Sequence, residues 1–248
     1  MEPGPPQSQS GATIGRTARS LFAPLGGDYD RWAGVLSFGQ DPRWRRFLVE
    51  RVPVERDACV LDVATGTGAI AIALALAHGC RVVGVDQSPE MLAGARLRVE
   101  QAGLAGRIEL RSGSADELSS LPAASFDGLT AGYLLRYVDD PGATAQRLLT
   151  LLRPGSPFAL LDFGVPPQPV ARAAWHLYTG VGLPVLGRIV SPGWGRVGTY
   201  LRPSIRSFEL RYPPDALRTL FTAAGGVDVQ ARRLSLGGCT VVWGVRAG

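Results

Sequence analysis

The sequence predicts an α/β fold: a doubly wound, mostly parallel sheet of seven strands, covered by helices on both faces and ending in an antiparallel hairpin. Two observations predict it. Through the middle of the chain, short apolar runs typical of strands alternate with helix-like segments, and this order produces a parallel sheet. At the C-terminal end, two strand-like runs at Val227–Leu234 and Cys239–Ala247 follow one another across a Gly237-Gly238 turn, which indicates an antiparallel pair.

The chain ahead of the first strand predicts a tail followed by helices. Residues 1–12 are rich in Pro, Gly, Ser and Gln and are expected to be flexible, whereas residues 13–248 are expected to form a single domain. Within that domain, residues 13–56 have a partly helical pattern. In Pro42–Val52 the apolar and the charged side chains fall on opposite faces, as in an amphipathic surface helix.

The first strand is expected at Ala58–Val63, a mostly apolar run that leads into a Gly-rich turn. Ala69–Ala77, which follows the turn, is rich in Ala, Ile and Leu and is typical of a buried helix. His78 and Gly79 suit the end of that helix, because Gly commonly follows the last turn and His interacts well with the negative end of the helix dipole.

The second strand is expected at Arg81–Val85, directly before Asp86. Ser88-Pro89-Glu90 is typical of a helix start: Ser caps the helix, Pro fits its first turn, and an acid suits its positive end. The remaining strand-like and helix-like segments are Ile108–Arg111, Phe126–Ala131, Ala143–Leu152, Phe158–Phe163 and Pro214–Ala224.

The composition carries a positive charge of an unusual kind. The 248 residues include 26 basic and 21 acidic side chains, a formal net charge of +5, and every basic residue is Arg because the chain has no Lys. The chain also has no Asn. Because Lys and Asn both need A-rich codons, the codon preference of a GC-rich genome is the simplest explanation for the absence of both. The charge nevertheless raises nucleic acid and anionic membrane surfaces as partner classes.

Other counts exclude whole classes of protein. A chain that is 46% hydrophobic and 19% charged is not disordered. Three scattered Cys without a CxxC pair argue against a disulfide scaffold or a zinc ribbon, and two His are too few for most imidazole-built metal sites, so no metal is expected. The longest apolar run, Ala69–Ala77, is far shorter than the ~20 residues of a membrane span, and the polar start does not resemble a signal peptide. We therefore expect a cytoplasmic protein, with contact to a membrane surface left open.

The stretch Val60–Gly68, VLDVATGTG, is the most informative part of the sequence. A strand runs into a Gly-rich turn, and a helix follows. Gly66 and Gly68 allow the backbone to approach a ligand closely, and Asp86 at the end of the next strand can accept hydrogen bonds from ribose hydroxyls. A nucleotide-like ligand is therefore expected at this turn.

Two ligands fit this layout. The spacing Gly66-x-Gly68-x-x-Ala71 loosely matches a dinucleotide fingerprint. Asp62, an acid within the strand just before the turn, disfavours an anionic pyrophosphate. S-adenosylmethionine (SAM) carries an ammonium group and a sulfonium, so a nearby carboxylate favours it over a dinucleotide.

Seven segments of the chain, between about Leu21 and Gly244, resemble the motifs of a known family. They are DYDRWAGVLSFGQDPRWRR (Asp28–Arg46), VLDVATGTG (Val60–Gly68), VVGVDQSPEML (Val82–Leu92), FDGLTAGYLLRYVDDP (Phe126–Pro141), LLRPGSPFALLDF (Leu151–Phe163), LPVLGRIVS (Leu183–Ser191) and YLRPSI (Tyr200–Ile205). The family is that of the ubiquinone/menaquinone biosynthesis C-methyltransferases, within the class I SAM-dependent methyltransferases. The resemblance implies a Rossmann-like class I methyltransferase fold with a lid-like helical insertion at residues 165–206.

The resemblance also implies a set of cofactor contacts. These are Asp62, Gly66, Thr67, Gly68, Asp86, Gln87, Ser114, Ala115 and Gly132. The Gly-rich turn would hold the methionine part of SAM, Asp86 its ribose, and Ser114 and Ala115 its adenine. Asp62 would orient the turn or the ammonium group, with a capping role that makes no ligand contact as the alternative.

Substrate-side roles follow from the same resemblance. The family's Gly-Leu-Arg-Asn tetrad reads Leu-Leu-Arg136-Tyr137 here, so Arg is retained and Asn is replaced. The residues expected to face the substrate are Tyr29, Tyr133, Tyr137 and Tyr200. The change in the tetrad leaves the exact acceptor open.

Methylation of a ring carbon requires a neighbouring phenol to lose its proton, and a general base contributes ~10²–10⁴-fold to such a step. The candidates for the base are Asp30, His176 and a water held by Arg136. Arg136 itself stays charged and is expected to stabilise a phenolate.

The expected function is therefore SAM-dependent C-methylation of a quinol ring, such as demethylmenaquinol or a related polyprenyl benzoquinol. Residues 175–189 are rich in apolar side chains and are expected to line a path for the tail, to lie on the bilayer, or only to cap the core. Methylation of another small aromatic or polyketide, and SAM binding without catalysis, remain open, as does a homodimer. No nucleic-acid partner is expected, because no base-methylating motif or RNA-binding segment is present.

Overall fold

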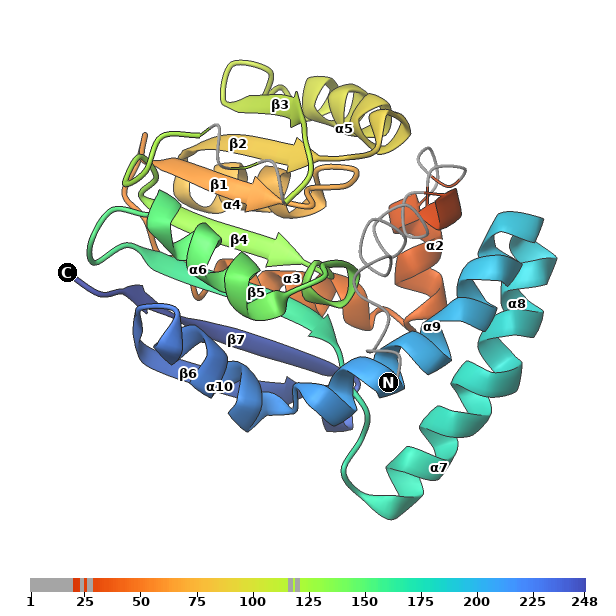
Figure 1. Ribbon diagram of the computed structural model, residues 1–248. Helices are drawn as coiled ribbons and strands as arrows, with labels where there is room; N and C mark the ends of the chain where they lie inside the picture. The colour runs from red at the N-terminus through yellow and green to blue at the C-terminus, as the bar shows by residue number, and fades with distance from the viewer. Residues whose placement is uncertain (1–19, 23–24, 26–28, 116–117, 119–120) are drawn as a thin grey trace, which may run out of the picture.

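The computed structural model describes residues 20–22, 25, 29–115, 118 and 121–248, so the expected tail at residues 1–12 lies outside the described part. One seven-stranded sheet runs through it in the order β3-β2-β1-β4-β5-β7-β6 (Figure 1). The strands are β1 (Cys59–Val63), β2 (Arg81–Asp86), β3 (Ile108–Ser112), β4 (Gly128–Gly132), β5 (Pro157–Phe163), β6 (Gly226–Leu234) and β7 (Cys239–Arg246). The predicted fold class is confirmed.

The register of the sheet explains its two halves. Strands β1 to β5 pair in parallel, with Leu61 opposite Val83 and Leu129 on its two neighbours. Strand β7 enters antiparallel to β5, with Leu160 opposite Val242, and pairs antiparallel with β6 on its other side. The two consecutive C-terminal strands thus form the antiparallel pair expected from their order.

Helices cover both faces of the sheet, as Figure 1 shows. On one face lie α3 (Gln40–Val49), α4 (Ala69–His78) and α5 (Pro89–Gln101); on the other lie α6 (Pro141–Leu151) and α10 (Pro214–Ala223). The helix starts follow local chemistry. Ser88 caps α5 by accepting a hydrogen bond from the Met91 backbone N–H, and Asp140 caps α6 through two backbone N–H groups.

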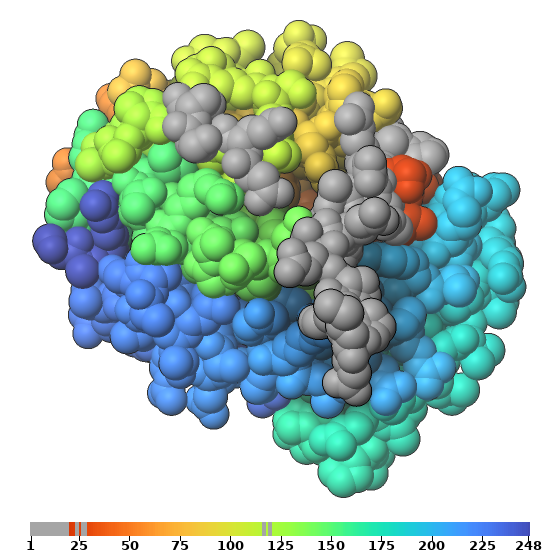
Figure 2. Space-filling view, viewed as in Figure 1, coloured from red at the N-terminus to blue at the C-terminus, as the bar shows by residue number. Residues whose placement is uncertain are grey.

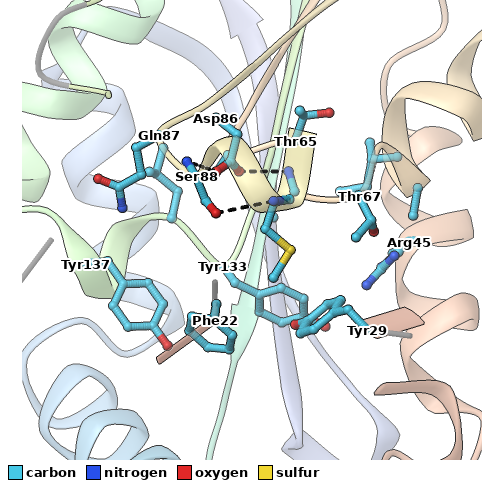
Figure 3. Close-up of a pocket in the computed structure, with 17 residues that line it drawn as sticks. Phe22, Tyr29, Arg45, Thr65, Thr67, Asp86, Gln87, Ser88, Tyr133 and Tyr137 are labelled. Carbon is cyan, nitrogen blue, oxygen red and sulfur yellow. Dashed lines mark hydrogen bonds between the residues drawn. The ribbon is translucent and has the colours of Figure 1, made fainter. Parts of the chain in front are cut away.

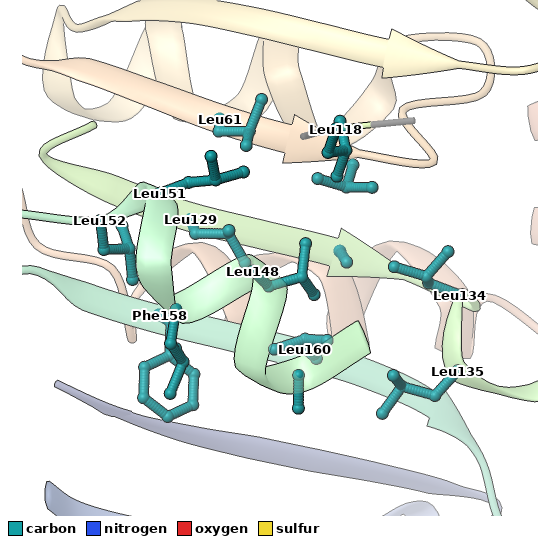
Figure 4. Packing of buried hydrophobic residues seen from close by; sticks show 14 of the residues in the cluster. Leu61, Leu118, Leu129, Leu134, Leu135, Leu148, Leu151, Leu152, Phe158 and Leu160 are labelled. Atoms are coloured by element: carbon teal, nitrogen blue, oxygen red, sulfur yellow. The ribbon is translucent and has the colours of Figure 1, made fainter. Parts of the chain in front are cut away.

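Each face of the sheet has its own apolar core. Figure 4 shows the first, in which Leu148, Leu151 and Leu152 pack over Leu129 and Leu160 of the central strands. The second core joins side chains of α3, α4 and α5 to the opposite face. The central strands are therefore buried on both faces and apolar almost throughout, as parallel strands usually are.

A third cluster of apolar side chains lies among the helices after β5, where the sequence predicted a lid-like insertion. These are α7 (Pro169–Leu177), a π-helical turn η4 (Tyr178–Gly182), α8 (Leu183–Val190) and α9 (Pro192–Arg211). Their inner side packs on α2 (Tyr29–Leu36). Figures 1 and 2 show α7 and α8 as a lobe that projects beside the sheet. We call residues 165–211 the lid; α9 runs five residues beyond the expected boundary at 206, because its apolar face continues to Phe208.

Candidate active site

The Gly-rich turn joins β1 to α4 and is held from below by Asp62. The Asp62 carboxylate is fully buried and accepts hydrogen bonds from the hydroxyls of Thr65 (2.6 Å) and Thr130 (2.7 Å). Gly66 and Gly68 both have positive φ, at 57° and 78°, which suits glycine. Asp62 therefore orients the turn.

Asp86, at the end of β2, fixes the other side of the turn. Its two oxygens accept hydrogen bonds from the backbone N–H of Gly66 (2.8 Å) and of Ser88 (2.9 Å). Burial raises the pKa of this carboxyl. Asp86 thus joins the Gly-rich turn to the start of α5, and its carboxylate faces the space between them (Figure 3).

That space is a cavity at the carboxyl ends of β1, β2 and β4, which we call the polar cavity. It is lined by Phe22, Tyr29, Arg45, Ala64, Thr65, Gly66, Thr67, Ala69, Ile70, Asp86, Gln87, Ser88, Met91, Gly132, Tyr133, Leu134 and Tyr137. In Figure 3, four aromatic rings lie on the side away from Asp86 and Ser88. Ligands of open α/β sheets bind at this end of the strands.

The structure brings eight of the expected site residues into this lining: Tyr29, Gly66, Thr67, Asp86, Gln87, Gly132, Tyr133 and Tyr137. Asp62 lies beneath the turn, and Gly68 lies at the N-terminus of α4. Ser114 and Ala115 follow β3 and do not line the cavity; the Ala115 carbonyl instead accepts a hydrogen bond from Arg147 (3.2 Å).

A second cavity, which we call the apolar cavity, lies between the sheet edge and the lid. It is lined by Phe22, Tyr29, Ala33, Leu36, Ser37, Phe38, Gln40, Asp41, Trp44, Tyr133, Arg136, Phe163, Trp175, Tyr178, Thr179, Leu183, Trp194, Val197, Leu201, Ile205, Ser235 and Gly238. Phe22, Tyr29 and Tyr133 line both cavities, so the two spaces meet at these three rings. A polar chamber thus adjoins an apolar one.

Arg136 is the cation of the apolar cavity. Its Nε donates to Asp162 Oδ1 at 2.5 Å, and both side chains are almost fully buried. Its Nη1 contacts the Ser204 hydroxyl of the lid at 3.3 Å. The other oxygen of Asp162 is buried without a hydrogen-bond partner among the described residues. The ion pair with Asp162 holds the Arg136 guanidinium at the wall of the apolar cavity.

The four expected tyrosines occupy different layers. Tyr29 stacks on Trp194 of the lid with ring centroids 5.5 Å apart. Tyr137 stacks on Tyr200, which lines neither cavity and lies behind it. The Tyr137 hydroxyl is buried without a hydrogen-bond partner among the described residues, and burial raises its pKa to about 12. Tyr137 therefore stays a neutral phenol.

Asp30 and His176, the expected bases, line neither cavity. Asp30 pairs with Arg45 (2.6 Å) and Arg98 and accepts a hydrogen bond from Thr67. Although burial by itself raises the pKa of Asp30, Arg45 and its other partners lower the pKa overall. His176 lies on α7 against Trp175, outside the cavity linings. The structure thus separates both expected bases from the cavities.

Comparison with known proteins identifies the family. The model of the ubiE/COQ5 methyltransferase family matches residues 13–246, nearly the whole chain. The chain belongs to the ubiE/COQ5 methyltransferase family. The expected family and enzyme class, a SAM-dependent methyltransferase, are confirmed.

Curated relatives of the ubiE/COQ5 family match over most of their length. A ubiquinone/menaquinone biosynthesis C-methyltransferase of Desulfotalea psychrophila is 32% identical, over 94% of this chain and 91% of the relative. A demethylmenaquinone methyltransferase of Thermus thermophilus is 35% identical, over 83% of this chain and 90% of the relative.

Solved structures match the fold at lower identity. A SAM-dependent methyltransferase from Thermotoga maritima has a TM-score of 0.57 at 18% identity, covering 92% of this chain and 98% of its own. The [4+2]-cyclase SpnF has a TM-score of 0.62 at 15% identity, covering 99% of both chains. These similarities show the fold alone, and the cyclase shows that this fold is not tied to one reaction.

For this ubiE/COQ5 family member, sequence reasoning missed the polar residues on α3. Asp41 lines the apolar cavity and Arg45 lines the polar cavity, and the two form an ion pair at 2.9 Å. The available signal was their spacing of four residues, but the predicted helix began at Pro42 and so left Asp41 outside it, whereas α3 begins at Gln40. The segment was expected to be an amphipathic surface helix, because the sequence does not show that this face of α3 turns toward the site.

Proposed function

We propose that this methyltransferase transfers a methyl group from SAM to a ring carbon of a polyprenyl quinol. One observation carries the proposal: the polar and apolar cavities meet at Phe22, Tyr29 and Tyr133. A donor in the first cavity and an acceptor ring in the second would face each other across these rings. Such positioning can supply ~7–11 kcal/mol of a reaction barrier.

The polar cavity fits SAM in shape and charge. Gly132 and Ile70 both line this cavity and pack closely, since a Cβ at Gly132 would lie only 2.9 Å from Ile70 Cδ1. Asp86 supplies a carboxylate for ribose hydroxyls, with Thr67 and Gln87 beside it. Ser114 and Ala115 would need to contact adenine from outside the present lining. When bound, SAM supplies an electrophilic methyl group on a sulfonium.

The apolar cavity fits a quinol with a long apolar tail. The rings of Trp44 and Tyr133 pack on Phe163 in its lining, and buried Leu183 and Leu201 of the lid line it as well. The names of the relatives, which refer to ubiquinone, menaquinone and demethylmenaquinone, support an acceptor of this class. Arg136 would stabilise the phenolate electrostatically, since a guanidinium keeps its charge at any physiological pH.

The lid has the features of a surface that binds an anionic bilayer. A bilayer would hold a quinol with a long apolar tail and present it to the lid. Residues 163–208 contain five Arg and no Asp or Glu. Val170, Leu177 and Ile189 are 83%, 68% and 77% exposed. Apolar side chains beside exposed arginines favour partition onto an anionic surface. Of the helices in the described ranges, none is both long and apolar enough to cross a bilayer.

A turnover assay tests the function. The purified protein is incubated with methyl-labelled SAM and, separately, a short-chain demethylmenaquinol, simple phenols, a polyketide phenol, and RNA. We expect label on the quinol ring carbon, located by fragmentation in mass spectrometry, and weaker SAM binding in Asp86→Ala. Label on another acceptor would replace the quinol assignment, and tight SAM binding with no transfer would support a non-catalytic protein.

A further inference from the structure

Methylation of a quinol carbon, the proposed function on which this inference rests, requires a group that takes the phenolic proton. That group must lie in the chamber that holds the acceptor ring. The ionisable side chains among the described residues of the apolar cavity are Tyr29, Asp41, Tyr133, Arg136 and Tyr178. The proton acceptor should be one of these or a water that one of them holds.

Four of the five are unsuited to accept a proton. Arg136 is a permanent cation. Burial raises the pKa of Tyr29 and of Tyr133 far above the usual value and that of Tyr178 to about 12, so all three are neutral phenols. Asp41 is the one carboxylate in the lining among the residues that the structure describes.

The side chain of Asp41 is buried in the wall of the apolar cavity and has a partner on each oxygen. It lies in the first turn of α3 and is 4% exposed. Its Oδ1 accepts a hydrogen bond from the Tyr133 hydroxyl at 2.6 Å, and its Oδ2 pairs with Arg45 Nη2 at 2.9 Å. Each oxygen keeps a further lone pair for a substrate hydroxyl.

Asp41 and Arg136 meet the same pair of aromatic rings. The ring of Tyr133, which donates to Asp41, stacks on Phe163 with centroids 4.4 Å apart. The guanidinium of Arg136 lies 5.3 Å from the centre of the Phe163 ring. An aromatic acceptor packed beside these rings would lie between a carboxylate and a cation.

We infer that Asp41 is the general base that removes the phenolic proton of the acceptor. The substrate O–H bond breaks, a new O–H bond forms on the Asp41 carboxylate, and the electron pair stays on the substrate oxygen, where the Arg136 guanidinium across the ring favours the negative charge. The ring carbon would then bond to the methyl group as the methyl–sulfonium bond breaks, with the bonding electron pair leaving on the neutral thioether. The methylated carbon releases its own proton to water, and Asp41 returns its proton to the oxygen. One proton is released overall, and Asp41 is regenerated.

The test compares Asp41→Asn with the wild type on short-chain demethylmenaquinol. Loss of the base should lower kcat by ~10²–10⁴-fold with the Kd of SAM little changed. The rate of the variant should then rise about tenfold per pH unit up to the phenol pKa of ~10, as the acceptor ionises in solution. An acceptor made more acidic by ring halogens should recover more of the lost rate in the variant than in the wild type.

Asp30→Asn is the matched control, because Asp30 also pairs with Arg45 but lines neither cavity. Any loss of kcat in Asp30→Asn should not be recovered as the pH rises. If Asp41→Asn fails to fold, a second variant, Asp41→Glu, tests the role instead. It keeps a carboxylate and should retain part of the wild-type kcat. Unchanged kcat in Asp41→Asn, or equal recovery in Asp30→Asn, would overturn the role. Failure of the wild type to methylate any phenol would instead refute the proposed function.

Discussion

Asp62 shows how one buried carboxylate supports the site. It lies under the Gly-rich turn, is fully buried, and accepts two threonine hydroxyls. Burial raises its pKa to about 6, above the value of ~3.9 in an unfolded chain. The folded state therefore keeps the proton over a window in which the unfolded state loses it.

The sign of the resulting pH dependence follows directly. The contribution of Asp62 to stability is full below about pH 4 and is lost as the pH rises through about 6. We expect the free energy of unfolding of the wild type, relative to Asp62→Asn, to fall by ~2 kcal/mol between about pH 4 and pH 6, and by ~3 kcal/mol between about pH 3 and pH 8. Urea unfolding of both proteins across this range measures it, with Asp228→Asn, at an exposed carboxylate, as the control. A constant difference would contradict the assigned pKa.

At the residue scale, sequence reasoning placed the cofactor side better than the acceptor side. Gly66 and Asp86 are identified by their positions in a strand, turn and helix, which are local features. Asp41 is brought to Tyr133, 92 residues away, only by the packing of α3 on the sheet. Asp30, not Asp41, was a candidate base from the sequence, and its pairing with Arg98, 68 residues away, could not be read from the sequence.

At the element scale, two helix caps with the same chemistry should have different functional effects. Ser88 caps α5 and lines the polar cavity, whereas Asp140 caps α6 and lines neither cavity. Ser88→Ala and Asp140→Ala should each lower the free energy of unfolding by ~1 kcal/mol, since each removes a cap.

Of these two substitutions, only Ser88→Ala should also weaken SAM binding. It loosens the start of α5, where Asp86 accepts a hydrogen bond from the Ser88 backbone N–H. Chemical denaturation and calorimetric titration with SAM measure the two effects. Equal Kd values for SAM in Ser88→Ala and the wild type would argue against a role of this helix start in the donor site.

At the scale of the whole molecule, the lid makes the charge distribution uneven. The lid, residues 165–211, contains six Arg and one acid, Glu209, so its net charge of 6 − 1 = +5 equals that of the entire chain. Sedimentation with vesicles should therefore show binding to anionic lipid at low salt, little binding to neutral lipid, and release at ~0.5 M salt, where screening acts within a few Å.

A triple variant, Val170→Ser, Leu177→Ser and Ile189→Ser, should lower the partition coefficient at least about tenfold, because it removes exposed apolar area. Leu97→Ser is the control, since Leu97 is 61% exposed on α5, outside the lid. Equal partition of the triple variant and the control would remove the lid from the membrane proposal.

The sequence by itself determined the seven strands, their alternation with helices, the Gly-rich turn and the family. These depend on period, turn chemistry and motifs, which act over a few residues. Only the tertiary structure decided that α3 and the lid enclose a second cavity, and that Asp41 lines it while Asp30 and His176 do not. The physical reason is that such contacts join side chains far apart along the chain, and their positions depend on how whole helices pack against the sheet.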